Sequence, residues 1–336
     1  MLFTGVLRKV TEVRNQNLLP INDSSLTSAP RMPEEAQQPK PAPSKKKVFL
    51  KRLVSSVILW AVVITSLFSG NKILSDYVFL AIMMILAWAG LVEFYNLLAH
   101  RNLYCFKGVG VLGGLLLMAS TFFYLSGQIV PVLQPSAAND FETSFLILFV
   151  LGLCVRQFVS KTNTAGLIAI STTLFGLMYV PYLLNFIQKI NFFPHLEGNG
   201  AYYILYFILV TKFSDLGAYC VGSLIGKHKM IPRISPGKTW EGFCGAIVIS
   251  TGASIAFAHF AQSKLVGMNL LHATILGVVL SLAAVVGDLI ESLFKREAGV
   301  KDSGTFFPGI GGILDLIDSI LFNAPIMYLY LRHILT

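Results

Sequence analysis

Long apolar runs decide which folds this chain can adopt. Stretches of 17 or more mostly apolar residues recur along its 336 residues, and each is long enough to cross the ~30 Å hydrocarbon core of a bilayer as a helix. Because lipid offers no hydrogen bonds to an open strand edge, only helices and closed barrels span membranes. Barrel strands would alternate apolar and polar residues over about ten positions, and these runs do not alternate. The sequence therefore predicts an all-α, polytopic helical membrane protein.

The runs predict about nine transmembrane helices in a chain of which only 13% is charged, whereas soluble domains carry about 25% charged residues. We expect N-terminal transmembrane helices in residues 45–200, and catalytic transmembrane helices with cytoplasmic loops in residues 201–336. Residues 1–44 are rich in proline and polar residues, so we expect a disordered cytoplasmic tail there. The expected spans are 53–70, 77–98, 108–127, 143–160, 165–187, 201–223, 243–260, 270–292 and 313–333.

Basic residues indicate how the spans are oriented. With the N-terminus in the cytoplasm, sixteen lysines and arginines beside the span ends face the cytoplasm. Four face the other side: Lys72, Lys189, Lys264 and Arg332. This bias follows the positive-inside rule, and attraction to anionic lipid explains the net charge of +9 without a nucleic-acid partner. We expect an integral membrane protein whose N-terminus and basic loops are cytoplasmic.

Acidic residues in the last two expected spans form a candidate metal site. Asp288 and Ser292 are four residues apart, and Asp315 and Asp318 are three apart, so each pair shares one face of a helix. If these helices pack together, three carboxylates and a hydroxyl converge. Such hard oxygen ligands suit Mg²⁺ rather than zinc.

Cations and glycines surround these candidate ligands. Cations neutralise phosphate oxygens, and glycine lets backbone N–H groups approach them. The last span begins just after Gly311 and Gly312, so its N-terminal dipole can face an anion. Together with the carboxylates, these are the components of phosphoryl or nucleotidyl transfer. The basic residues concerned are Lys238, Lys295, Arg296 and Lys301.

The stretch SPGKT, residues 235–239, is not a Walker A motif. Pro232 stands where that motif requires a glycine, and no strand is expected before it. We expect a basic loop instead.

Simpler roles compete for several of these residues. Asp315 and Asp318 could complement the macrodipole at a helix start. Asp215 could cap a helix end or pair with Lys212 inside the bundle. Two basic residues would serve as membrane anchors whatever the function, namely Lys295 and Arg296.

Three glutamates have no assigned part in this site. Glu241 and Glu291 are expected to be ordinary loop-facing charges. Glu93 lies inside an apolar span, and nothing nearby in the sequence indicates its partner.

The stretch SLFKREAGVKDSGTFFPGIGGILDLIDS, residues 292–319, resembles the signature of phosphatidate cytidylyltransferases, also called CDP-diacylglycerol synthases. That signature runs S-x-x-K-R, four residues, K-D-x-G, P-x-H-G-G and D-R-x-D. Upstream, SDLGAY and ISPGKTWEG are similar to other stretches typical of the family. The matching positions are Ser292, Lys295, Arg296, Lys301, Asp302, Gly304, Pro308, Gly311, Gly312, Asp315 and Asp318.

The resemblance implies transfer of a cytidylyl group from CTP to phosphatidate within the bilayer, giving CDP-diacylglycerol and pyrophosphate with Mg²⁺ as cofactor. The implied metal ligands are Asp288, Ser292, Asp315 and Asp318. The implied catalytic residues are Lys238, Lys295, Arg296 and Lys301. The implied substrate-binding residues are Asp215, Ser235, Lys238, Asp302, Gly311 and Gly312. The sequence leaves open whether a monovalent cation accompanies Mg²⁺ and whether the chain forms a homodimer.

Three positions depart from the family pattern. The His before the Gly-Gly pair is Ile310 here, the Arg between the two aspartates is Leu316, and the Thr often found after the upstream Asp is Leu216. If that His or Arg contacts the substrate phosphate, this chain must use another donor, react more slowly or take a related substrate. The candidate metal ligands are intact, so cytidylyl transfer stays the main hypothesis.

Two other functions fit parts of the same pattern. A CTP-dependent kinase of a lipid alcohol, such as a polyprenol or phytol kinase, would use the same metal and cations but attack a different phosphorus. An ion or anion transporter would use the intramembrane aspartates without chemistry. Basic loops gathered on one side and the absence of internal repeats argue against the transporter.

Overall fold

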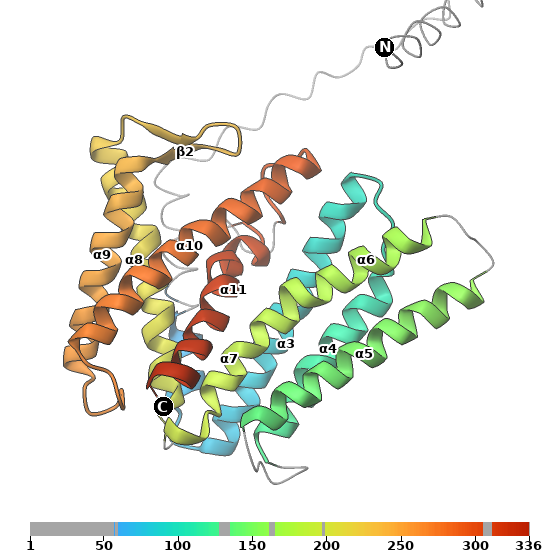
Figure 1. Ribbon diagram of the computed structural model, residues 1–336, viewed down its shortest axis with the longest axis horizontal. Helices are drawn as coiled ribbons and strands as arrows, with labels where there is room; N and C mark the ends of the chain where they lie inside the picture. Colours follow the sequence, from blue (N-terminus) through green and yellow to red (C-terminus); the bar gives the residue numbers. More distant parts are fainter. Residues whose placement is uncertain are drawn as a thin grey trace, which may run out of the picture. The chain divides into compact units, whose positions relative to one another are not determined.

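The computed structural model describes residues 57, 60–127, 135–160, 165–196, 199–304 and 311–335. Within these ranges 8 helices are long and apolar enough to cross a membrane, which confirms the all-α, polytopic class (Figure 1). Residues 60–68, inside the first expected span, are also helical. The expected tail at 1–44 lies outside the described residues, and contacts group Ser44–Thr336 into one compact unit.

The N-terminal helices match the expected spans closely. Asn71 caps the first of them, because its side chain accepts a hydrogen bond of 3.3 Å from Leu74 N. Pro181 lies in a π-helical turn within the span Gly166–Asn191, where its missing N–H interrupts the regular helix. The elements are α3 (Lys72–His100), α4 (Lys107–Leu125), α5 (Pro135–Val159), α6 (Gly166–Leu177), η2 (Met178–Tyr182), α7 (Leu183–Asn191) and η3 (Pro194–Leu196).

The C-terminal elements contain a short hairpin that the sequence did not predict. We expected a basic loop at residues 235–239, whereas these residues form a strand that pairs antiparallel with residues 229–231. The hairpin pairs Ile231 with Ser235 and leads directly into the next helix. The elements are α8 (Gly200–Ile225), β1 (Lys229–Ile231), β2 (Ser235–Thr239), α9 (Trp240–Phe260), α10 (Leu270–Ala298), α11 (Ile313–Tyr330) and η4 (Leu331–Leu335).

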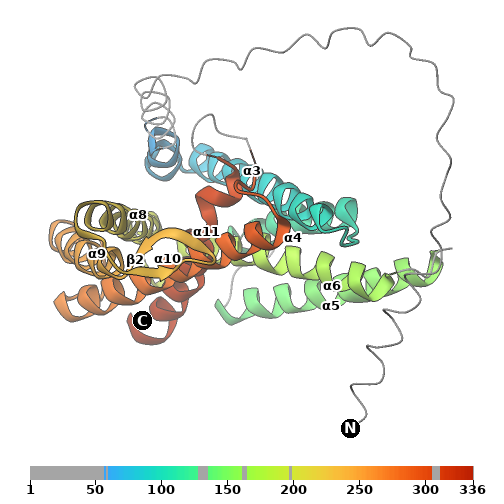
Figure 2. The same cartoon turned by 90° about the horizontal axis from the view of Figure 1, so that it is seen from above.

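Small hydroxyl side chains join the three helices that carry the hairpin and the acidic residues. In both views α8, α9 and α10 lie side by side (Figures 1 and 2). Ser250 on α9 donates to the carbonyl oxygens of Val210 on α8 and Gly277 on α10, each at 3.2 Å. Ser254, one turn further along α9, lies 2.6 Å from the Tyr206 hydroxyl. Such interhelical hydrogen bonds fix helix packing where lipid supplies no hydrophobic drive.

A buried ion pair joins α5 to α7 in the other half of the bundle. Lys189 Nζ contacts Glu142 Oε2, and their side chains are 2% and 0% exposed. Lys189 also donates to Asn139 Oδ1 at 2.9 Å, and Asn185 Nδ2 donates to Glu142 Oε1 at 3.2 Å. The position of Lys189 near the end of an expected span predicts that its charge faces the far side of the membrane, whereas the structure buries it inside the bundle. Its lysine charge is neutralised by a carboxylate on a neighbouring helix.

Candidate active site

A glycine allows the two acid-bearing helices to approach closely. A Cβ atom at Gly287 on α10 would lie 2.8 Å from the Asp318 carbonyl oxygen and 3.2 Å from Ser319 Cα, both on α11. These are backbone atoms, so any larger residue would push the helices apart. The next residue, Asp288, therefore stands beside the first turns of α11.

Three carboxylates meet at this close approach. One oxygen from each of Asp288, Glu291 and Asp318 lies within 4.8 Å of the other two. Glu291 is 0% exposed and Asp318 6% exposed. We call these three residues the carboxylate cluster. A group of like charges this well buried is expensive unless cations accompany it.

Glu291 corrects one expectation from the sequence. It was expected to face a loop, whereas it is fully buried within α10. Its spacing of three residues from Asp288 puts both on one face, and that spacing was the available signal. Among the described residues neither carboxylate oxygen of Glu291 has a hydrogen-bond partner of regular geometry, although Lys295 forms an ion pair with Oε2.

Asp315 lies outside the carboxylate cluster. Its Oδ1 accepts from Lys295 Nζ at 2.6 Å, and its Oδ2 accepts from Ser303 Oγ and Gly312 N, each at 2.9 Å. Asp315 therefore closes the first turn of α11 and connects it to the segment after α10. Ser292, the remaining candidate ligand, donates to Asp288 Oδ1 at 3.4 Å.

Three lysines accompany the acidic residues. Lys238 Nζ on β2 lies 2.7 Å from Asp288 Oδ2, and Lys295 bridges Glu291 and Asp315. Lys212 Nζ lies 3.4 Å from Asp215 Oδ2, so the two residues pair as the sequence allowed, with side chains that are 30% and 42% exposed. With Asp318 the site holds five carboxyl groups against three ammonium groups. The acidic groups thus outnumber the basic groups by two, which favours the binding of a further cation.

The hairpin is fixed next to these groups by polar contacts at both ends. Thr239 Oγ1 accepts from Gly242 N at 3.1 Å and caps α9. Glu241 accepts from the backbone nitrogens of Lys227 and His228, each at 3.2 Å. Arg296 on α10 donates from Nε to the Ile234 carbonyl oxygen at 3.1 Å. These contacts place Lys238 over the acidic residues.

A cavity of about 580 Å³ opens beside the carboxylate cluster, within the range of about 300–1,000 Å³ that small-molecule sites occupy. We call it the polar cavity. The residues predicted from the sequence that line it are Asp215, Ser235, Lys238, Asp288, Lys295, Asp315 and Asp318. Three other predicted residues have exposed side chains and do not line it, namely Arg296, Lys301 and Asp302. Gly311 and Gly312 precede α11, and Ile310 lies outside the described residues.

Glu93 on α3 has a role that the sequence did not indicate. It is 7% exposed, and its carboxylate accepts from Ile313 N at 3.0 Å and from Leu314 N at 2.8 Å. These are two of the free N–H groups at the start of α11, where the helix dipole also favours a negative charge. Glu93 contacts Ser303 Oγ at 3.3 Å as well. A carboxylate from α3 thus positions the helix that carries Asp315 and Asp318.

The carboxylate cluster fits a hard divalent cation. It offers two buried carboxylates and the partly exposed carboxylate of Asp288, with no thiolate and no imidazole, and oxygen ligands of this kind select Mg²⁺, Ca²⁺ or Mn²⁺. Neither oxygen of Glu291 has a hydrogen bond of regular geometry, and only Oε2 is in an ion pair with Lys295. The excess of acidic over basic groups also favours the binding of a cation.

A family model described as the cytidylyltransferase family matches residues 50–334. The chain belongs to this family. Family membership makes the chain a nucleotidyltransferase and accounts for a cavity rich in both carboxylates and lysines. It also agrees with the resemblance of residues 292–319 noted from the sequence.

Three phosphatidate cytidylyltransferases are similar to this chain over different lengths. A phosphatidate cytidylyltransferase of Staphylococcus epidermidis is 32% identical over 281 residues, which are 83% of this chain and 98% of the relative. One from Staphylococcus haemolyticus is 36% identical over 210 residues, covering 58% of this chain and 80% of the relative. One from Staphylococcus aureus is 43% identical over 158 residues, covering 47% and 58%.

Proposed function

We propose that this cytidylyltransferase transfers the cytidylyl group of CTP to phosphatidate, giving CDP-diacylglycerol and pyrophosphate. The observation that carries the proposal is the carboxylate cluster with its lysines, facing a 580 Å³ cavity between helices long enough to span a membrane. Relatives named for phosphatidate and cytidylyl transfer support the choice of substrates. We place the chain in the cytoplasmic membrane with the polar cavity open to the cytoplasm, as the distribution of basic residues favours.

Asp288, Glu291 and Asp318 would hold a divalent ion, for which we propose Mg²⁺. When bound, the ion supplies positive charge to the triphosphate and fixes its orientation. Asp315 and Ser292 support this arrangement from beside the cluster, since Asp315 holds Lys295 and Ser292 holds Asp288.

The lysines stabilise the negative charge that develops during transfer. A phosphate oxygen of phosphatidate forms a bond to the α-phosphorus of CTP, the α–β anhydride bond breaks, and pyrophosphate leaves with the electron pair. Lys238 and Lys295 line the cavity in which the triphosphate would lie, so they stabilise the charge on the leaving pyrophosphate. Because the lipid phosphate is already ionised near neutral pH, alignment and charge neutralisation suffice without a strong general base.

Labelled CTP tests this function against the lipid-alcohol kinase. Purified protein and Mg²⁺ are incubated with phosphatidate and, in a parallel reaction, with a lipid alcohol such as a polyprenol, each with CTP labelled at the α-phosphate, and lipid and water phases are separated. We expect the label in the lipid, and CTP labelled at the γ-phosphate should release its label as pyrophosphate. Label that leaves only as CDP, with γ-label in the lipid, would contradict the proposal and favour a kinase. Ion movement across liposomes without any labelled lipid would favour a transporter.

A further inference from the structure

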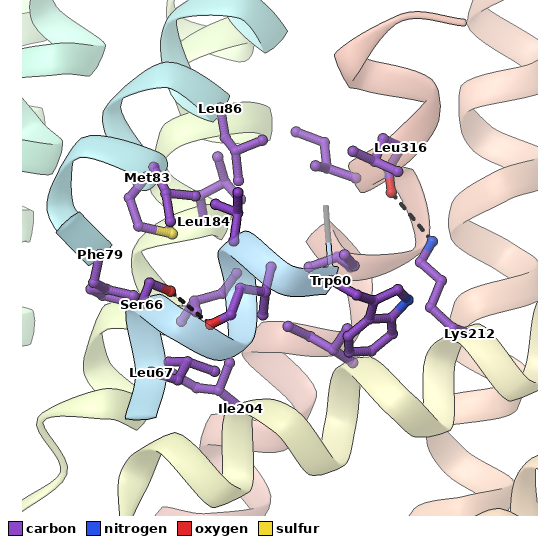
Figure 3. A pocket seen from close by; sticks show the side chains of 17 residues that line it. Trp60, Ser66, Leu67, Phe79, Met83, Leu86, Leu184, Ile204, Lys212 and Leu316 are labelled. Carbon is purple, nitrogen blue, oxygen red and sulfur yellow. Dashed lines mark hydrogen bonds between the residues drawn. The ribbon is translucent and has the colours of Figure 1, made fainter. Parts of the chain in front are cut away.

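A second cavity, of about 480 Å³, lies further along the same face of α8 than the polar cavity, and it is lined by a different face of α11. Its walls come from residues 60–67, α3, α7, α8 and α11 (Figure 3). Every lining side chain except Ser66 and Lys212 is apolar or aromatic. We call it the apolar cavity. Its lining includes Trp60, Leu67, Phe79, Ile82, Met83, Leu184, Ile204, Ile208, Leu316 and Ile320.

Lys212 connects the two cavities. Its side chain lines the apolar cavity, yet its Nζ lies 3.4 Å from Asp215 Oδ2, which lines the polar cavity. The same Nζ donates to the Leu316 carbonyl oxygen at 3.4 Å, as Figure 3 shows. Leu316 stands between Asp315 and Asp318, so the cation lies at the backbone of the segment that carries both acids.

The charged end of the apolar cavity lies next to the polar cavity. Ile204, Ile208 and Lys212 follow each other at four-residue intervals along one face of α8. That spacing corresponds to about 12 Å of helix axis. Lys212 therefore marks one end of the apolar cavity, which extends along α8.

We propose that the apolar cavity holds one acyl chain of phosphatidate and that Lys212 binds the lipid phosphate at the boundary with the polar cavity. The inference rests on the proposed function and names the lipid subsite within it. An acyl chain that moves from the bilayer into the cavity gains little binding free energy, because it exchanges lipid for similarly apolar side chains. The cavity therefore acts mainly by aligning the headgroup, while the charge on Lys212 selects an anionic phosphate.

Lys212 also accounts for a departure from the family signature. Leu316 occupies the position where that signature has an arginine, and both Leu316 and Lys212 line the apolar cavity. A cation supplied from α8 thus stands where α11 lacks one. A charge restored at position 316 would face the same space.

Filling the apolar cavity tests the acyl-chain site. Ile82 on α3 lines it, whereas Ile85, three residues on, is 50% exposed and lines neither cavity. Turnover is compared for dioleoyl and dihexanoyl phosphatidate in wild type, Ile82→Trp, the milder Ile82→Phe, and Ile85→Trp as matched control. We expect Ile82→Trp to lower kcat/KM at least tenfold with the long-chain lipid and less than threefold with the short-chain lipid. Ile82→Phe should fall between, and Ile85→Trp should leave both values unchanged.

Exchanging the cation tests the phosphate contact. Lys212→Met should raise the KM for phosphatidate about tenfold and change the KM for CTP less than twofold. Adding Leu316→Arg to Lys212→Met should recover most of the loss, whereas a purely structural role for Lys212 predicts no recovery. An equal rise of both KM values without recovery would contradict the contact.

These outcomes separate the inference from the proposed function. If wild type converts neither phosphatidate with CTP, the proposed function fails. The other adverse result is that wild type converts both lipids, while Ile82→Trp and Ile82→Phe lower kcat/KM by the same factor for the two lipids or leave it unchanged. That result overturns the acyl-chain site while the proposed function stands. Equal reduction is the result that a resident, non-substrate phospholipid in the cavity would give.

Discussion

Among the described residues, the Glu142–Lys189 pair and the carboxylate cluster differ in how their charges are balanced. In the first, Glu142 and Lys189 neutralise each other, with amide partners on the remaining polar atoms. In the second, carboxylate oxygens of Asp288, Glu291 and Asp318 lie within 4.8 Å of one another, and Glu291 lacks hydrogen bonds of regular geometry. The first group adjoins a cavity of only about 10 Å³ and the second one of about 580 Å³.

The difference separates a structural use of buried charge from a chemical one. A closed pair completes its own electrostatics, so it links α5 to α7 and has no remaining capacity for a ligand. An incomplete cluster beside an open cavity can accept a further cation, and that cation can in turn hold a triphosphate. Substitutions in the two groups should accordingly affect different properties.

The largest expected effect is on activity, from the incomplete cluster. Asp318→Asn removes one of three convergent carboxylates, so we expect turnover to fall by about 10³-fold or more, the scale of losing a central electrostatic group. The thermal unfolding temperature in detergent should not decrease. Turnover is measured from α-labelled CTP over a range of Mg²⁺ concentrations. Activity above a tenth of wild type with unchanged Mg²⁺ dependence would remove the cluster from the site.

The next effect is on stability, from the closed pair. Lys189→Met leaves the Glu142 carboxylate buried without its cation, which typically costs about 3–5 kcal/mol. Combining it with Glu142→Gln removes the orphaned charge and should regain most of that loss. Thermal unfolding in detergent measures both variants, and activity per folded molecule should stay near wild type in the double variant. A double variant as unstable as the single one would show that the pair does more than neutralise charge.

A smaller effect is expected where α3 meets α11. Glu93→Ala leaves the N–H groups of Ile313 and Leu314 without their acceptor, and each unsatisfied buried group costs about 1–3 kcal/mol. We expect turnover to fall roughly 10- to 100-fold, together with a higher Mg²⁺ requirement, because α11 carries Asp318. Glu93→Gln keeps one acceptor oxygen and should retain more activity. The exposed Glu297→Ala serves as control, and equal loss in both alanine variants would refute a specific role for Glu93.

The smallest effect concerns the hairpin. Arg296→Gln removes the hydrogen bond to the Ile234 carbonyl oxygen, a contact worth about 1 kcal/mol. We expect a two- to fivefold rise in the KM for CTP, since Lys238 on the hairpin is then less well placed. Arg233→Gln, an exposed charge on the same hairpin, should change the KM less than twofold. If the two variants behave alike, Arg296 contributes only its charge.

The helices were predictable because the membrane leaves the backbone few choices. Each apolar run must satisfy its own N–H and C=O groups within lipid, so length and hydropathy alone located the spans. Asp288 and Asp318 were predictable for a related reason. Their spacing to neighbouring polar residues within one helix is a local property that the sequence displays.

The remaining features depend on contacts between distant parts of the chain. Glu93 accepts from residues 220 and 221 positions away, and no pattern around it shows this. In the sequence Lys189 has the position of a charge at the end of a span. Its partner Glu142 lies on another helix, so the pair is visible only in the structure. The strand at residues 235–239 forms because residues 229–231 pair with it, a contact that a search for loop motifs does not test.

Metal binding tests the central claim most directly. Mn²⁺, a spectroscopic substitute for Mg²⁺, is titrated into purified protein without nucleotide, and free and bound metal are separated by electron paramagnetic resonance. The wild type and the Glu142→Gln/Lys189→Met variant should bind Mn²⁺ alike, and Asp318→Asn should bind it at least tenfold more weakly. Equal affinity in all three proteins, or no bound Mn²⁺ in an active wild type, would contradict the account.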